Sequence, residues 1–306
     1  MKKIFTTLVC LMFAGSLASA WEVKLGDRTM NIFNYIQTRY CFSPAGTDQF
    51  SVPRLRTDFS GDIGKLAGYF IEVDYVTTPA LVYGWANVKL PFGKLSMGRF
   101  YEPFGLEYTT PPSNFDTINP TNMLWYYFGY SRDIGIELSN NLGFMKYGVA
   151  IVNGADNKFV DDNRAKDLVG RFVFMPNSNL AYGFSGYTGK TGTMEMEKSL
   201  AGAEISYNCS IGSLKGEIIG GKMNGANSFG WYLQPLIGIK TPLQLLLRYE
   251  SWDPNTAIAG DLTGTLTLGV NYFFDEGSKL QINYENKAEE TPIDNNALLV
   301  QLQVNF

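Results

Sequence analysis

The side chains of this chain that could perform chemistry are carboxylates, arginines and lysines, because its 306 residues include no histidine. Without histidine there is no Ser-His-Asp or Cys-His nucleophile, and most zinc sites lose a ligand. A carboxylate pair could still hydrolyse a glycoside, but no carboxylate spacing in the sequence indicates one. We therefore expect no enzymatic activity, no catalytic residue, no metal site and no cofactor.

The charged residues recur instead at alternate positions of short segments. The clearest sets are Arg54, Arg56 and Asp58; Glu72 and Asp74; Asp133 and Glu137; and Arg248 and Glu250. Side chains at positions i and i+2 of a strand point to the same face. Each set is therefore predicted to lie on one face of a strand, with apolar residues on the other face.

The same alternation predicts about sixteen strands and no long helix. In residues 298–306, for example, Leu298, Val300 and Leu302 share one face. The predicted strands lie near residues 29–41, 51–60, 66–76, 82–90, 94–102, 130–139, 144–153, 167–175, 180–188, 199–207, 212–222, 228–239, 242–252, 261–274, 278–286 and 297–306.

Two features favour a transmembrane antiparallel β-barrel over a soluble sheet. Most predicted strands are long enough to cross a bilayer at a tilt, which takes about 9–11 residues. Aromatic residues gather at the predicted strand ends, where such barrels carry interfacial girdles; they are Tyr69, Tyr75, Tyr101, Tyr207, Trp252, Tyr272 and Phe274. Lipid cannot satisfy an open sheet edge, so the sheet must close, with its charged face turned toward a water-filled lumen.

The connections support this topology because short and long ones alternate, as in barrels with short periplasmic turns and longer outer loops. The predicted short turns are residues 61–65, 140–143, 176–178 and 275–277, and the predicted long loops are 103–129, 154–166, 189–198, 253–260 and 286–296. An exception is the outer connection near residues 77–81, which is short.

The N-terminus predicts secretion. Residues 1–20 combine Lys2 and Lys3, an apolar stretch and a small-residue site at 18–20, which is the pattern of a signal peptide. We expect one barrel domain over residues 21–306, located in the bacterial outer membrane. Cys41 and Cys209 fall at opposite ends of that barrel, so we expect no disulfide. The net charge of −4 argues against a nucleic-acid partner.

Several segments, in this order, resemble the phosphate-selective porin O and P family over nearly the whole predicted mature chain. They are residues 54–59 (RLRTDF), 98–107 (GRFYEPFGLE), 132–138 (RDIGIEL), 152–154 (VNG), 166–172 (KDLVGRF), 230–235 (GWYLQP), 248–254 (RYESWDP), 268–273 (LGVNYF) and the terminal Phe306. The resemblance implies a sixteen-stranded, homotrimeric porin in contact with outer-membrane lipid, whose third loop opens near residue 103.

The charges on the predicted inner faces do not form the surplus of Arg and Lys expected of a phosphate filter. The pore-lining candidates are Arg54, Arg56, Asp58, Glu72, Asp74, Lys89, Arg99, Asp133, Glu137, Arg248 and Glu250. Those near Arg56 could equally be cross-strand ion pairs that stiffen the wall. The direction of Arg99 is ambiguous, because Met97 and Tyr101 are expected to point outward unless a bulge or strand end intervenes.

The third loop, residues 103–129, is the longest predicted connection, and loops of this length are usually functional. We expect it to fold into the lumen as a constriction, although an outer lid or a trimer contact would also fit. Its constriction candidates are Glu102, Glu107, Asp116, Trp125 and Tyr126. The fourth loop, residues 154–166, is rich in Asp and Asn but lacks a calcium-loop spacing, so we expect a solvated loop.

Three functions remain open from the sequence. The first is a general porin that lets small ions and solutes diffuse passively through the outer membrane. The second is a channel selective for anions or phosphate. The third is a protein that does not conduct, either a barrel used as an anchor or adhesin or a soluble secreted β-protein. Lumen charge, the third loop and the need for detergent distinguish them.

Overall fold

The computed structural model describes residues 21–306 except 27, 45, 47, 130, 239–241, 291 and 292, so the predicted signal peptide lies outside the described residues. Its strands are β1 (Trp21–Leu25), β2 (Arg28–Phe42), β3 (Gln49–Ile63), β4 (Ala67–Asp74), β5 (Leu81–Leu90), β6 (Gly93–Phe100), β7 (Asp133–Asn141), β8 (Met145–Val152), β9 (Asp167–Phe174), β10 (Leu180–Thr191), β11 (Met196–Cys209), β12 (Gly212–Met223), β13 (Ala226–Ile237), β14 (Leu243–Asp253), β15 (Thr263–Phe273), β16 (Lys279–Glu289) and β17 (Ala297–Asn305).

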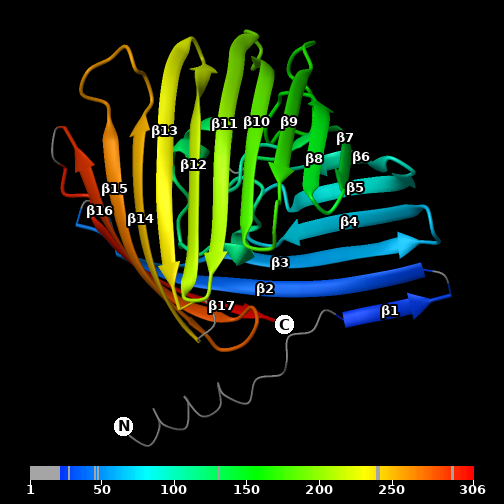
Figure 1. Ribbon diagram of the computed structural model, residues 1–306, viewed down its shortest axis with the longest axis horizontal. Coiled ribbons are helices and arrows are strands. Elements are labelled where there is room, and N and C mark those ends of the chain that lie inside the picture. The colour runs from blue at the N-terminus through cyan, green and yellow to red at the C-terminus, as the bar shows by residue number, and fades with distance from the viewer. Residues whose placement is uncertain are drawn as a thin grey trace, which may run out of the picture.

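The strands β2 to β17 form a closed antiparallel barrel of 16 strands. Each pairs with its neighbours in sequence, and β17 pairs with β2 to close the ring. The short strand β1 pairs with residues 28–32 of β2, whereas β17 pairs with residues 35–42 on the same edge of that strand. In Figure 1 the wall curves from β2–β6, which run across the view, to β10–β15, which run up it.

All sixteen predicted strands are present, and among the described residues β1 is the one strand that the sequence pattern missed. Five residues are too few for alternation to stand out. The long-loop end of the barrel carries the third loop (residues 101–132) and the fourth loop (153–166), and the short-turn end carries turns such as 64–66 and 142–144. The long loop predicted at 189–198 is wrong, because β10 and β11 extend to leave only residues 192–195 between them.

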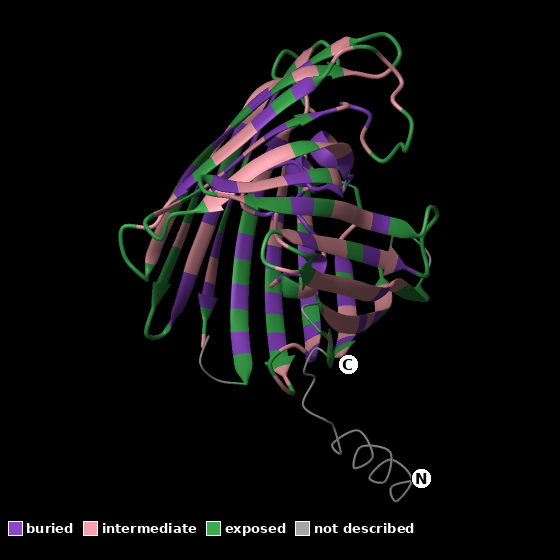
Figure 2. Cartoon of the chain, turned by 90° about the vertical axis from the view of Figure 1, so that its right-hand side faces the viewer, coloured by how far each residue is buried: buried purple, intermediate pink, exposed green. Residues whose placement is uncertain are grey.

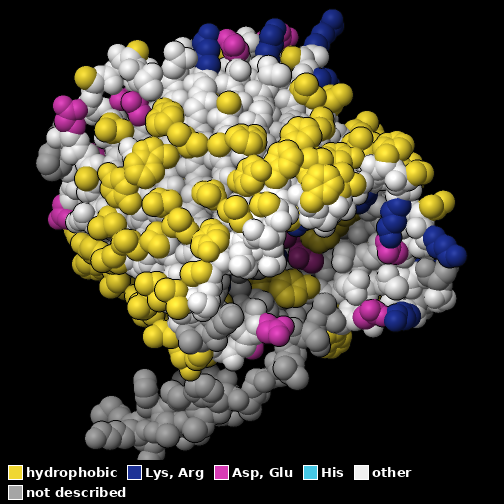
Figure 3. All heavy atoms as spheres, in the orientation of Figure 1, with side chains coloured by type: hydrophobic (Ala, Val, Ile, Leu, Met, Phe, Trp, Pro, Cys, Tyr) yellow, Lys and Arg dark blue, Asp and Glu magenta, His cyan; other side chains and the backbone are white. Residues whose placement is uncertain are grey.

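The expected alternation of side chains is confirmed in strand β14. Gln244, Arg248 and Glu250 are buried inside the barrel, while Leu245 and Leu247 are exposed on its outer surface. Figure 2 shows the resulting bands of buried and exposed residues along the strands. Hydrophobic side chains cover the outer wall in Figure 3, and charged ones gather at its rims. A surface of this kind suits hydrocarbon, with the polar face turned inward.

Within the described residues, no helix has the length and apolar character needed to cross a membrane.

The hydrophobic core lies inside the barrel, around the third loop. Phe104, Tyr108, Tyr127 and Phe128 of the loop pack in one cluster with inward residues of the wall. Two aromatic residues predicted for the outer girdle belong to this interior instead. Tyr101 follows the end of β6 and packs on Tyr108. The inward-facing Trp252 packs on Tyr126 and Tyr127.

The two described cysteines are free, as predicted. Cys41 pairs with Gln49 beside the connection between β2 and β3, at the long-loop end. Cys209 pairs with Gly212 across the turn between β11 and β12, at the short-turn end. The height of the barrel therefore separates them, and a disulfide would need Cα atoms within about 7 Å.

Candidate functional site

The third loop folds into the barrel and contacts the inner wall far from its own strands. It contains a 3₁₀ turn, η1 (Pro112–Asn114), and the helix α2 (Asn122–Phe128). The side chain of Thr121 accepts a hydrogen bond from the Leu124 amide and so caps the start of α2. Gly129 ends the helix at a φ of 54°, a left-handed conformation that glycine adopts readily. These local signals turn the chain back along the wall.

Inward carboxylates hold the amides of this loop. Glu217 of β12 accepts hydrogen bonds from the backbone N–H groups of Leu106 and Glu107, at 2.9 and 3.1 Å. Glu250 of β14 accepts from the Asn122 amide at 3.3 Å. Within the loop, Glu107 accepts from both the amide and the hydroxyl of Thr121. Burial raises the pKa of Glu107, and the nearby charge of Arg248 opposes that shift.

Inward cations hold the carbonyls of the same loop. The guanidinium of Arg248 donates to Glu107 Oε1 at 3.2 Å and to the carbonyl of Asn119 at 3.1 Å. Lys279 of β16 donates to the Phe115 carbonyl at 2.6 Å. Arg39 of β2 donates to the Ile118 carbonyl at 3.3 Å. The loop therefore lies against the wall from β12 round to β2, and its backbone dipoles are satisfied by wall charges.

The position of the loop changes what two pore-lining candidates contact. The Arg248 side chain is 1% exposed and that of Glu250 is 4% exposed, although both point into the barrel. The loop lies between them and the open lumen. Asp133 is likewise fully buried, and it accepts hydrogen bonds from the amides of Gly154 and Ala155 in the fourth loop.

On the opposite wall, strands β3 and β4 carry the ion pairs that the sequence left as one of two interpretations. The Arg56 guanidinium lies 2.7 Å from Glu72 Oε1 and 2.8 Å from Asp74 Oδ2. Asp58 is half-buried opposite Glu72 in the register. Arg54 is also half-buried and donates to Gln37 at 2.8 Å. Arg56, Glu72 and Asp74 are therefore buried in an ion-pair cluster, whereas Arg54 and Asp58 keep partial exposure.

The remaining wall candidates lie at three different levels. Lys89 is exposed near the short-turn end and pairs with Asp62 at 2.9 Å. Glu137 is partly buried in the middle of β7. Arg99 is buried and donates to the Val82 carbonyl and to Asn157.

The ambiguity at Arg99 is resolved by the end of β6. Gly98 has a φ of 139°, and a Cβ there would lie 2.2 Å from the Gly84 carbonyl oxygen. This irregular backbone and the strand end at Phe100 let both Arg99 and Tyr101 become buried while Met97 stays exposed. The expectation that Tyr101 points outward was therefore wrong.

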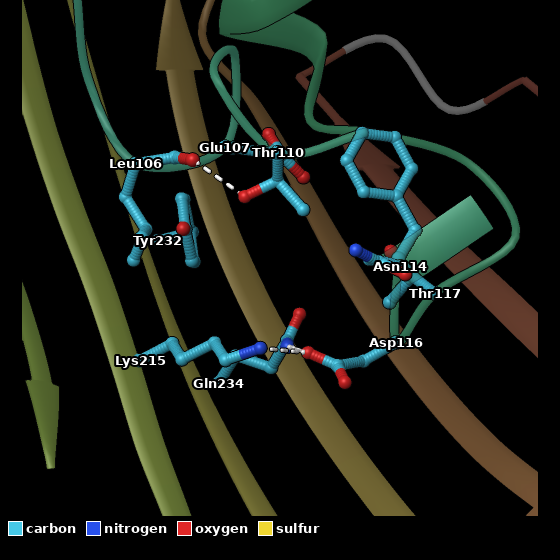
Figure 4. Close-up of a pocket in the computed structure, with 10 residues that line it drawn as sticks. Leu106, Glu107, Thr110, Asn114, Asp116, Thr117, Lys215, Tyr232 and Gln234 are labelled. Atoms are coloured by element: carbon cyan, nitrogen blue, oxygen red, sulfur yellow. Dashed lines mark hydrogen bonds and ion pairs between the residues drawn. The ribbon is translucent and has the colours of Figure 1, made fainter. Parts of the chain in front are cut away.

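Among the constriction candidates, Asp116 makes the clearest contact between the third loop and the wall. Its carboxylate lies 2.6 Å from the Lys215 ammonium of β12 and 2.9 Å from the amide nitrogen of Gln234 in β13. Figure 4 shows Lys215 and Gln234 pointing toward Asp116 from the wall. A small cavity of about 30 Å³ separates the loop from the wall here, enough for a water molecule.

The other loop candidates have different surroundings. Glu102 is fully buried and accepts a hydrogen bond from the Tyr108 hydroxyl. Burial raises the pKa of Glu102 to about 7, while the Lys198 charge and the Tyr108 hydroxyl act against the shift. Tyr126 packs on Trp252, and Trp125 is exposed.

Several contacting residues were absent from the candidates drawn from the sequence. Arg171 of β9 pairs with Glu204 at 2.5 Å and donates to Thr109 of the third loop. Lys198 is buried against the rings of Phe128 and Tyr187. Arg39, Arg171 and Lys198 each occupy an inward position of their strand, so alternation was the available signal. In the part of the chain that the structure describes, no three acidic or cysteine side chains converge on a metal site.

Neither a protein-family model nor a curated protein matches the sequence. Solved structures match it as a fold. Salmonella typhi OmpF in complex with daunomycin has a TM-score of 0.71 and 11% identity, covering 94% of this chain and 100% of that one. The anion-selective porin from Comamonas acidovorans has a TM-score of 0.69 and 14% identity, covering 91% and 99%.

The outer membrane channel DcaP of Acinetobacter baumannii has a TM-score of 0.61 and 12% identity, covering 94% of this chain and 100% of that chain. At such identities the likeness concerns the fold. This chain folds as a closed β-barrel of the kind found in bacterial outer-membrane porins, and the finer resemblance to the phosphate-selective porin O and P family stays a prediction.

Proposed function

We propose that this protein is an outer-membrane porin that lets small ions and solutes diffuse passively through its lumen. One observation carries the proposal: a long loop lies inside a closed barrel and is bound to the wall by polar and charged side chains. A barrel of sixteen strands is too wide to be filled by its own side chains. A loop bound along part of the inner wall narrows such a lumen, which is what a diffusion channel needs and an enzyme does not.

The membrane location of the proposal rests on the outer surface and the N-terminus. The outward residues Leu243, Leu245, Leu247 and Tyr249 of β14 form an exposed apolar row that water would not favour. Residues 1–20 have the pattern of a signal peptide. We propose that this segment is removed and that residues 21–306 form the single mature domain.

We further propose a homotrimer, formed through the outer face of strands β2 to β5. Beside exposed apolar residues such as Ile71 and Val88, this face carries small and polar outward residues, namely Asn34, Thr57, Gly84 and Ala86. Thr57 donates a hydrogen bond to Asn34 at 2.8 Å. Polar groups that face hydrocarbon are costly, whereas a partner barrel can shelter them. Small side chains also let two walls approach closely.

A second candidate is an anion-selective channel, and one observation favours it. Many inward carboxylates, such as Glu217, Glu250 and Asp133, are buried and occupied by backbone amides. Buried, bonded charges contribute less to a water-filled path than half-exposed ones such as Arg54. A simple count of acidic and basic inward residues therefore underestimates the influence of the half-buried arginines Arg39, Arg54 and Arg171.

Single-channel recording of the refolded protein in a planar bilayer under a KCl gradient tests both candidates. Steady conductance with weak selectivity supports the general porin. A reversal potential close to that of chloride, with block by phosphate, supports the anion channel. Inserted protein without conductance would remove both and leave a barrel anchor or adhesin.

A further inference from the structure

A cavity of about 260 Å³ lies inside the long-loop end of the barrel. It lies between strands β3–β6 and the loops at residues 75–80, 101–132 and 153–166. Its charged lining residues are Arg54, Arg56, Asp74, Arg99 and Arg132. A solute that enters from the long-loop end would pass this cavity before it reaches the pair formed by Asp116 and Lys215.

Arginines outnumber carboxylates among the residues that line the cavity. Four arginines line it, against one carboxylate of the lining, Asp74. Glu72 adds a second negative charge, because it lies 2.7 Å from Arg56 and 3.7 Å from Arg132. Asp58 faces Glu72 from β3, and Asp133 beside Arg132 is bonded to the fourth-loop amides. Glu72, Asp58 and Asp133 are not among the residues that line the cavity, so the surface that a ligand meets carries four guanidinium groups and the single carboxylate of Asp74.

The arginines are held in place before any ligand arrives. Arg56 is fixed by Glu72 and Asp74. Arg99 is fixed by the Val82 carbonyl and by Asn157, and its guanidinium stacks 4.7 Å from the centre of the Phe159 ring.

Arg132 is held in a similar way, because its guanidinium lies 4.3 Å from the centre of the Tyr101 ring. A site in which the cations are already oriented loses less entropy when it binds an anion.

Part of the remaining cavity wall is apolar, which restricts the class of anion. Pro53, Pro79, Leu81 and Val82 contribute to the lining next to the arginines. An inorganic anion would leave this side in contact with nothing but water. An organic acid would place its carboxylate on the guanidinium groups, which bind carboxylates in a two-pronged geometry, and its carbon body on the apolar side.

We propose that this cavity binds small organic carboxylates and so enriches them at the outer side of the constriction. The proposal rests on the proposed function, because enrichment matters only if solutes pass through the lumen. The volume lies just below the roughly 300–1,000 Å³ of typical ligand pockets, so the ligand is of the size of benzoate. Compared with a channel that lacks such a site, the flux of the preferred solute is higher at low solute concentration and reaches a plateau at high concentration.

The test uses the full mature protein in planar bilayers, with benzoate added on the long-loop side. Benzoate is expected to reduce the KCl current reversibly, and neutral benzamide of the same shape is not. Arg54→Gln should weaken the effect of benzoate by about tenfold, the value of a lost charge-assisted hydrogen bond. Arg54→Lys keeps the positive charge but loses the two-pronged guanidinium geometry. Its response to benzoate should therefore lie between those of Arg54→Gln and the unaltered protein.

Lys65→Gln is the matched control, since it removes one positive charge from an exposed turn at the short-turn end. It should leave the benzoate effect unchanged. The proposal is overturned if benzamide acts like benzoate, if Lys65→Gln acts like Arg54→Gln, or if phosphate acts as strongly as benzoate. Calorimetric titration of benzoate into the detergent-solubilised protein separates the two proposals. Benzoate binding without any channel conductance would contradict the porin function and support the carboxylate site. Conductance without benzoate binding would support the porin function and contradict the carboxylate site.

Discussion

Individual charged side chains inside this barrel bind the backbone of the third loop as much as they face the lumen. Arg248 is the clearest case, because one guanidinium contacts Glu107, Thr117 and the carbonyl of Asn119. Its side chain is almost completely buried. A buried charge that loses its partner is strongly destabilising. The residue therefore acts first as an anchor of the loop.

We predict that Arg248→Met lowers the free energy of unfolding by about 3–5 kcal/mol, the cost of breaking a buried ion pair. The remaining Glu107 carboxylate would stay buried without its cation. Urea titration of the protein in detergent micelles, followed by tryptophan fluorescence, measures this change. The double variant Arg248→Met with Glu107→Gln should recover part of the loss. Equal stabilities for the single and double variants would contradict this account.

Glu102 predicts a dependence of stability on pH. Burial raises the pKa of Glu102 from an ordinary value of 4.5 to about 7 in the folded protein. A raised carboxyl pKa favours the folded state when the group is protonated, so its stabilising effect is complete below pH 4.5. That effect is lost as the pH rises through 7, by about 3 kcal/mol for this shift.

Glu102→Gln should therefore stabilise the folded protein at pH 8 and flatten its stability between pH 4.5 and 7. Unfolding free energies in detergent at several pH values measure this slope. Glu276→Gln is the control, because Glu276 is exposed in a short turn and should leave the slope unchanged. An unchanged slope in Glu102→Gln would show that another group controls the pH response.

At the scale of elements, the strands and their inner faces could be predicted from the sequence, and the contacts of the third loop could not. Alternation is a local signal: Gln244, Arg248 and Glu250 share a face whatever lies opposite. The bond from Glu217 to the Leu106 amide joins segments that are 111 positions apart. No local pattern marks such a contact, so Glu217 looked like any other inward charge.

The aromatic residues illustrate the same limit. Trp252 stands near the end of a strand, as girdle residues do, yet it is 6% exposed because loop residues Tyr126 and Tyr127 cover it. Position along a strand is visible in the sequence. Coverage by a loop that returns from elsewhere in the chain is not.

The third loop as an element should control the size of the conducting path. Replacing residues 111–120 with a short Gly-Ser linker removes the segment bound by Lys279, Asn283 and Arg39. We predict that single-channel conductance rises severalfold, because the lumen loses its constriction while the barrel wall stays intact. Planar-bilayer recording measures the conductance, and circular dichroism checks that the barrel remains. Unchanged conductance in a folded variant would contradict the constriction role.

At the scale of the whole molecule, barrel closure depends on a long-range pairing that the pattern of the strands implies but does not specify. β17 pairs with residues 35–42 of β2, and β1 pairs with residues 28–32 of the same strand. The need to leave no open edge in lipid predicts that the ends of the chain meet. That argument does not predict that the first five described residues form a strand of their own beside the C-terminus.

At the scale of the whole molecule, the polar outward residues Asn34 and Thr57 of β2 and β3 are the basis for predicting where copies of the chain meet. Ala86 of β5 and Ala201 of β11 are both exposed, outward-facing alanines. Ala86 lies on the β2–β5 face, where Asn34 and Thr57 point outward beside exposed apolar residues such as Ile71 and Val88. Ala201 lies outside that face, near Ile205 and Tyr207. In lipid, a tryptophan at either position is tolerated. Between two closely packed barrels, it is not.

We predict that Ala86→Trp converts the proposed trimer into monomers, whereas Ala201→Trp leaves it assembled. Size-exclusion chromatography with light scattering, in a mild detergent, measures the mass of each variant. The two substitutions add the same apolar volume, so a change in detergent binding affects both alike. If only Ala201→Trp gave monomers, the interface would have to include the outer face around β11 and not that of β2 to β5. A monomeric unaltered protein would mean that Asn34 and Thr57 face lipid unaided, and that their mutual hydrogen bond satisfies both groups.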